Sequence, residues 1–128
     1  MNLKNYEKIE STNIEFKEMV EYNKSKSWLK SVSAFANSTG GTLLFGVRDV
    51  DKKPVGLDNV IKDSEKISEL INNKITPLPR YELNAIKEDG KEFIEVKVGD
   101  GPRTPYYYNR LFLKHNGGID EKGIINFF

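Results

Sequence analysis

Cysteine is absent from this chain of 128 residues, and histidine and tryptophan occur only once each. Without thiols the protein can form neither a disulfide bond nor a thiolate metal site. The lone histidine, His115, excludes a metal site built on several histidines and argues against a Ser-His catalytic triad. These absences remove the disulfide-linked and zinc-thiolate classes of small domain.

Long apolar segments are also missing. No run approaches the length of a membrane span, and the charged first twenty residues, MNLKNYEKIESTNIEFKEMV, lack the apolar centre of a signal peptide. The pattern G-x-x-x-x-G-K-[ST] does not occur, so these residues hold no Walker A loop for the phosphates of ATP. We expect a cytoplasmic protein with no membrane partner.

The length of the chain corresponds to about one domain, and it suffices to bury a hydrophobic core without cross-links. No internal repeat or linker interrupts the sequence. We therefore predict a single domain over residues 1–128.

The formal net charge of +1 hides an uneven distribution. Residues 22–48 contain four basic residues and no acid, and residues 101–119 contain three and no acid. These windows sum to +7, so the remainder of the chain carries −6. Such segregation can build the basic face of a phosphate-backbone binder on a nearly neutral protein, although ordinary solvated lysines give the same pattern.

The N-terminal half predicts a strand, a helix and a second strand. Alternation in TNIEFKEMV places Ile14 and Phe16 on one face and Glu15 and Lys17 on the other. The segment SKSWLKSVSAFANSTGG has apolar residues at helical spacing, serines to cap its start, and Gly40 for the left-handed position past its end. The segment TLLFGVRD is typical of a central strand that is apolar on both faces.

The C-terminal half predicts a second helix followed by hairpins. DSEKISELINNKI has apolar residues at helical spacing, with Asp63 as the expected N-cap and Pro77 beyond its end. RYELNAIK and EFIEVKV alternate on either side of Asp89-Gly90, a pair that suits a tight hairpin turn. TPYYYNRLFLKHNGG offers a further short hairpin.

The expected order is therefore strand, helix, strand, helix, strand, strand and a C-terminal hairpin, which is an α+β fold with a mixed sheet and two main helices. We expect six sheet residues to be buried under the helices: Ile14, Phe16, Leu43, Phe45, Ile94 and Val96. Trp28, Phe35, Ile67 and Leu70 are expected to cover them.

Several segments together resemble a known family. ESTNIEFK, WLKSVSAFANSTGGTLLFGVRD and PYYYNRLFLKHNGG are similar to the Schlafen-AlbA-type DNA-binding domain, over roughly residues 7 to 120. The resemblance implies an Alba-related fold and nucleic-acid binding, with DNA favoured over RNA. Bacterial members often form the N-terminal part of longer transcriptional regulators or helicase-related proteins, which implies the same placement for this domain.

The basic residues give the expected nucleic-acid interface. Lys26 and Lys30 project from the first helix, and Gly40 and Gly41 leave room for a sugar-phosphate backbone, although a helix cap and a strand entry also explain the two glycines. The family pattern has an arginine where this chain has Lys114, which keeps the charge but loses the planar fork of arginine. The predicted set is Lys17, Lys26, Lys30, Gly40, Gly41, Arg48, Arg103, Arg110 and Lys114.

A divalent-metal nuclease is the first alternative. Some Schlafen relatives are nucleases, and the resemblance places their catalytic acidic residues at Glu10, Glu15 and Asp49. With Asp51, these residues form the candidate Mg²⁺ or Mn²⁺ site, in which the metal would activate water. A pairing of Glu15 with Lys17 and turn roles for Asp49 and Asp51 explain the same residues without a metal.

Two further hypotheses concern the tyrosines and the end of the chain. Tyr106, Tyr107 and Tyr108 lie between Arg103 and Arg110 and could stack on the bases of a single strand, although strand alternation buries at least one of them. The second alternative function is a protein-interaction or homo-oligomerisation module that uses the tyrosine strand and IINFF. No cofactor is expected unless the protein is a nuclease.

Overall fold

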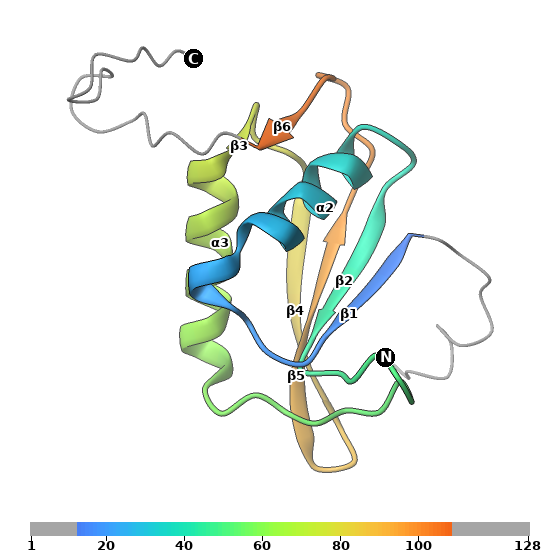
Figure 1. Cartoon of the computed structure of the whole chain (residues 1–128), viewed down its shortest axis with the longest axis vertical. Helices are drawn as coiled ribbons and strands as arrows, with labels where there is room; N and C mark the ends of the chain where they lie inside the picture. The colour runs from blue at the N-terminus through green and yellow to red at the C-terminus, as the bar shows by residue number, and fades with distance from the viewer. Residues whose placement is uncertain (1–12, 109–128) are drawn as a thin grey trace.

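The computed structural model describes residues 13–108 and confirms the predicted α+β class (Figure 1). In chain order the elements are β1 (Ile14–Lys17), the 3-10 helix η1 (Tyr22–Lys24), α2 (Lys26–Ala36), β2 (Gly41–Phe45), α3 (Val60–Lys74), β3 (Ile75–Thr76), β4 (Tyr81–Glu88), β5 (Lys91–Val98) and β6 (Tyr107–Tyr108). The main sheet has the order β1-β2-β5-β4, in which β1 and β2 are parallel and the other neighbours antiparallel. Both helices cover one face of this sheet (Figure 1).

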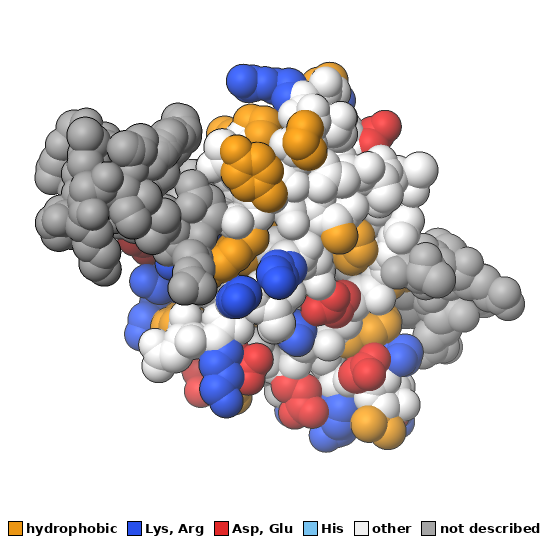
Figure 2. Space-filling view, turned by 45° about the horizontal axis from the view of Figure 1, so that its top comes forward, with side chains coloured by type: hydrophobic (Ala, Val, Ile, Leu, Met, Phe, Trp, Pro, Cys, Tyr) orange, Lys and Arg blue, Asp and Glu red, His pale blue; other side chains and the backbone are white. Residues whose placement is uncertain are grey.

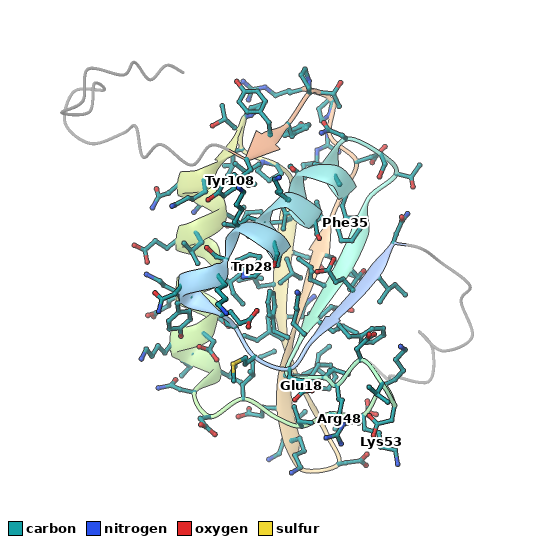
Figure 3. The ribbon with its side chains drawn as sticks, in the orientation of Figure 1. Glu18, Trp28, Phe35, Arg48, Lys53 and Tyr108 are labelled. Carbon is teal, nitrogen blue, oxygen red and sulfur yellow. The ribbon has the colours of Figure 1, made fainter. Side chains whose placement is uncertain are left out.

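The core lies between that face and the two helices. Leu43 pairs with Val96 and Phe45 with Ile94 across β2 and β5, and all four side chains are buried. From α2, Trp28 meets Phe45 edge to face with ring centroids 5.0 Å apart, and Phe35 packs near the other end of the helix (Figure 3). The predicted helix face is therefore confirmed.

The orientation predicted for β1 is wrong. Its parallel register sets Glu15 beside Leu43 and Lys17 beside Phe45, so Glu15 and Lys17 project toward the helices. Ile14 and Phe16 project from the opposite face of the sheet, where they are half-buried against Leu44, Val47 and Phe93. Alternation specified two faces but could not say which one the helices cover.

The tight turn between β4 and β5 forms where the sequence predicts it, whereas the N-cap of α3 lies earlier in the chain than predicted. Asp89 and Gly90 both have positive φ, 54° and 75°, as expected for the predicted tight turn between β4 and β5. The N-cap of α3 is Asn59, whose side chain accepts the Lys62 amide at 3.0 Å, so the cap lies four residues before the predicted one, Asp63, and the helix begins at Val60. Asp63 lies in the first turn of α3, where an acid also suits the helix dipole.

The double glycine between α2 and β2 is required by packing. Gly40 has φ of +92°, and its amide donates to the Phe35 carbonyl at 2.9 Å, which closes the end of α2. A Cβ atom on Gly40 would lie 2.7 Å from the Val98 carbonyl oxygen. At Gly41 a Cβ atom would lie 2.5 Å from the buried ring of Phe35. The helix can therefore turn into the sheet only with glycine at both positions.

The expected C-terminal hairpin is described only in its first strand. Tyr107–Tyr108 forms β6, which pairs antiparallel with β3 just after α3. The rest of the expected hairpin lies outside the described residues. Among residues 13–108, none of the helices is long and apolar enough to cross a membrane.

Candidate functional site

The outer surface of α2 carries the predicted lysines. Lys26 and Lys30 lie one helical turn apart and are exposed, and α2 has no acid in its first turn. Neither lysine takes part in an ion pair with any residue in the 13–108 range. Ser33 continues the same row but is buried, and the next residue in the row, Asn37, bonds the chain that leads into β6. The lysines therefore lie on the flank of α2 that leads to β6.

Asn37, just past the end of α2, fixes the chain that leads into β6. Its side-chain amide donates to the Tyr106 carbonyl at 2.7 Å, and its side-chain oxygen accepts the Tyr106 amide at 2.7 Å. The Gly101 amide also donates to the Ala36 carbonyl at 3.0 Å. No sequence pattern predicts this clamp, because an asparagine after a helix usually indicates only a cap or a turn.

The loop before β6 closes around the phenol of Tyr106. This side chain is buried, and its hydroxyl oxygen accepts the Arg103 amide at 3.0 Å. A Cβ atom on Gly101 would lie 2.1 Å from the same hydroxyl, so the loop has no room for another side chain there. The tightly closed loop holds the exposed Arg103 and Tyr107 on its outer side.

Basic and apolar side chains meet at this end of the molecule. Figure 2 shows hydrophobic side chains gathered at the upper part of the view, with Lys and Arg side chains above and below them. Leu78 and Tyr107 are the large hydrophobic residues exposed near the β3–β6 pair, at 56% and 51%. We call Lys26, Lys30, Arg103 and Tyr107 the α2–β6 surface.

The other predicted cations are placed differently. Lys17 forms an ion pair with Glu15 at 3.7 Å, and Arg48 forms one with Asp51 at 3.1 Å. Figure 3 shows Arg48 and Lys53 at the end of the molecule opposite Tyr108. Arg110 and Lys114 lie outside the described residues. Lys26 and Lys30 therefore lie in the first turns of α2, Arg103 lies on the loop held at the other end of that helix, and Arg48 is at the opposite end of the molecule (Figure 3).

The predicted metal-binding carboxylates have protein partners. Glu15 accepts a hydrogen bond from the Ser31 hydroxyl at 2.6 Å in addition to its ion pair with Lys17. Asp49 pairs with Lys52 at 3.2 Å. The Arg48 hydrogen bond to Asp51 is the main reason that the pKa of this carboxyl is lowered. Such pairs offset the repulsion that would otherwise favour a cation.

Within the described part of the chain, no three Asp, Glu, His or Cys side chains come close enough together to hold a metal ion. Glu10, the remaining predicted ligand, lies outside that part. The metal site therefore stays a prediction.

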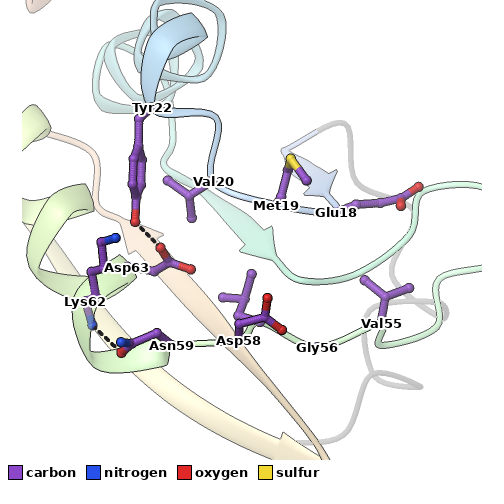
Figure 4. Close-up of a pocket in the computed structure, with 11 residues that line it drawn as sticks. Glu18, Met19, Val20, Tyr22, Val55, Gly56, Asp58, Asn59, Lys62 and Asp63 are labelled. Atoms are coloured by element: carbon purple, nitrogen blue, oxygen red, sulfur yellow. Dashed lines mark hydrogen bonds between the residues drawn. The ribbon is translucent and has the colours of Figure 1, made fainter.

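A cleft of about 470 Å³ lies beside the start of α3 (Figure 4). Residues from the segments 18–22 and 55–63 line it, and the charged ones among them are three carboxylates, Glu18, Asp58 and Asp63, and one lysine, Lys62. The Tyr22 hydroxyl donates to the Asp63 carboxylate across this cleft. The excess of negative charge makes the cleft unsuitable for a phosphate group.

The Tyr22 hydrogen bond gives a pH prediction. The Asp63 carboxylate, helped by partial burial, raises the pKa of Tyr22 to about 12. Because the folded pKa lies above the unfolded value of 10.0, the stabilisation is complete below pH 10 and is lost as the pH rises through 12. In an ultraviolet titration, one tyrosine should ionise well after the others. Asp63→Asn should return it to the common range, and Tyr22→Phe should remove the late transition.

The family model described as Schlafen, AlbA_2 matches residues 10–122. The chain belongs to the Schlafen AlbA_2 family. An uncharacterised ATP-binding protein of Ureaplasma parvum serovar 3 is 30% identical over 86 residues, which are 65% of this chain and 24% of that protein. This chain thus spans about a quarter of the relative it matches.

Solved structures share the fold of this Schlafen AlbA_2 chain. The N-terminal domain of a protein related to the ATP-dependent DNA helicase RecG, from Nitrosomonas europaea, superposes with a TM-score of 0.69 at 23% identity. That match covers 97% of this chain and 92% of that domain. The DIP2311 protein of Corynebacterium diphtheriae gives a TM-score of 0.54 at 17% identity, over 73% of this chain and 19% of that protein.

Proposed function

We propose that this Schlafen AlbA_2 chain binds nucleic acid, DNA in preference to RNA, through the α2–β6 surface. The observation that carries the proposal is the set of three exposed cations, Lys26, Lys30 and Arg103, which form no ion pair within residues 13–108. Of the other predicted cations, Lys17 and Arg48 are each matched by a carboxylate, and Lys53, a lysine without an ion pair in that range, lies at the opposite end of the molecule (Figure 3). Unmatched cations on one side of a nearly neutral protein favour a polyanionic ligand.

The structure around these cations suits contact with a backbone rather than with a small molecule. The lysines lie on a regular helix, and the Asn37 clamp holds the loop of Arg103 against the end of that helix. Their spacing is therefore fixed before a ligand arrives, which lowers the ordering cost of binding. A DNA preference is supported by the structural neighbour, whose name relates it to a DNA helicase.

We also propose a role in a longer protein. The Ureaplasma relative is about four times as long as the matched segment, and its name describes ATP binding. A domain of this kind would hold DNA while other parts of the protein act on it, as in a transcriptional regulator or a helicase-related enzyme. Arg110 and Lys114 are proposed to add to the same basic surface.

The salt dependence of binding tests the proposal. The double variant Lys26→Ala/Lys30→Ala should weaken duplex binding and flatten the log-log salt slope by about 1.8, because each lost phosphate contact removes about 0.9. The matched control is Lys53→Ala/Lys87→Ala, which removes the same charge from exposed positions away from α2. Binding can be followed by fluorescence anisotropy across a salt series.

The two double variants separate a local interface from a general charge effect. The control should keep the wild-type slope. Equal loss in both double variants would show that net charge, and not the α2–β6 surface, drives binding. An unchanged slope in Lys26→Ala/Lys30→Ala would remove α2 from the interface.

A further inference from the structure

We infer that Tyr107 stacks on an unpaired base, so that the α2–β6 surface takes single-stranded nucleic acid in preference to a duplex. The inference rests on the proposed function and names its ligand more closely. Three observations carry it: the exposure of Tyr107, the rigidity of the loop before it, and its position at the end of a helix flank that carries unmatched cations.

The three consecutive tyrosine side chains differ in how exposed they are to solvent. Tyr106 is 2% exposed and forms part of the core, and Tyr108 is half-buried against that core. Tyr107 pairs with Thr76 of β3 and is 51% exposed. Only Tyr107 therefore presents its ring to a ligand, whereas the sequence left all three as candidates.

The ring of Tyr107 is attached to a firmly held backbone. The preceding residue, Tyr106, bonds Asn37 through both its amide and its carbonyl, and its phenol accepts the Arg103 amide. The following residue pairs with Ile75 in the β3–β6 ladder. An aromatic side chain on such a backbone has only two side-chain torsions to fix, so stacking on it costs little conformational entropy.

The surroundings of Tyr107 favour an unpaired strand. The Asn37 clamp places Tyr107 next to the end of α2, whose flank carries Lys26 and Lys30, and Arg103 lies on the loop between. Bases in a duplex cover one another and show only their edges, so an exposed ring finds no base face there. A single strand offers phosphates to the cations and base faces to the ring together.

An exposed apolar group also suits a protein partner, which makes that partner the competing explanation. Leu78 is exposed near the same strand pair and has no planar ring. A protein interface would use Leu78 and Tyr107 alike, whereas base stacking needs only the ring. Leu78→Ala is therefore the matched control for Tyr107→Ala.

The decisive probe is a short oligothymidine strand compared with the same strand made of abasic sites, because the two carry equal phosphate charge. The full chain should bind the oligothymidine between about five-fold and a hundred-fold tighter, which is the usual range for one base–aromatic stack. Tyr107→Ala should reduce this ratio to near one, while Tyr107→Phe and Leu78→Ala should keep it. A duplex of the same length should bind more weakly than the oligothymidine.

The outcomes distinguish this inference from the proposed function. If the full chain binds both strands equally, or if Tyr107→Ala keeps the ratio, phosphate binding stands and base stacking is overturned. If the chain binds neither strand nor duplex at low salt, the proposed function fails as well. If Tyr107→Ala and Leu78→Ala change self-association in sedimentation and leave the ratio intact, the ring belongs to a protein interface and the inference is wrong.

Discussion

Replacing Gly41 by alanine is expected to lower the free energy of unfolding by about 3 kcal/mol, the upper part of the range for overpacking a core. The new methyl carbon would lie 2.5 Å from two atoms of the Phe35 ring. That ring is 8% exposed and packs between α2 and the sheet, so it has little room to move aside. For a domain of this size the melting temperature should fall by on the order of 10 °C.

Gly99→Ala is the matched control for this substitution. A Cβ atom at Gly99 would meet the Arg80 side chain at 3.6 Å, an ordinary contact distance. Urea unfolding should therefore show a midpoint near that of the wild type for Gly99→Ala and a much lower midpoint for Gly41→Ala. Similar midpoints in the two variants would mean that Phe35 does not rest on Gly41.

Replacing Asn37 by alanine is expected to cost about 2 kcal/mol, because it leaves two backbone groups of the buried Tyr106 without their partners. Asn37→Asp keeps the acceptor and loses the donor, so its cost should be smaller. Urea unfolding measures both. Ser38→Ala, at the neighbouring exposed position, removes only the hydrogen bond from the Ser38 hydroxyl to the Phe35 carbonyl at 3.2 Å, so its cost should be much smaller.

The destabilisation caused by Asn37→Ala should also be confined to the loop before β6. Hydrogen exchange at the Tyr106 amide should accelerate in Asn37→Ala more than exchange in β2 and β5, because the clamp holds the loop and not the sheet. An equal acceleration throughout would indicate that the loop and the core open together. In that case the clamp would be a part of the global fold.

Sequence patterns predicted the helices well because each has a single apolar face. Trp28 and Phe35 are two turns apart on α2 and both are buried as predicted; on α3, Ile67 is buried as predicted, whereas Leu70 is only half-buried against the same core. The pattern in β1 was less informative, because Ile14 and Phe16 are as apolar as core residues but lie on the face away from the helices. Glu15 projects toward α2 and bonds Ser31, a contact between residues that no local pattern connects.

Local sequence features predicted only a part of the candidate site. The lysines of α2 follow from helical spacing and the acid-free window, both of which are local features. The Asn37 clamp joins residues 69 positions apart in the chain, so only the folded structure could reveal it. The choice of Tyr107 among three tyrosines likewise depends on how β6 pairs with β3.

In the proposed complex, the length of α2 sets the footprint of the protein on a strand. A helix of 11 residues is about 17 Å long, a distance covered by about five nucleotides at the 3.4 Å rise of a strand stacked as in a duplex, and by fewer in a more extended strand. A strand that continued past the start of α2 would meet the cleft that Tyr22 lines. The carboxylates of this cleft would repel its phosphates. Each copy should therefore occlude only a handful of nucleotides, and a long strand should saturate at a high density of bound protein.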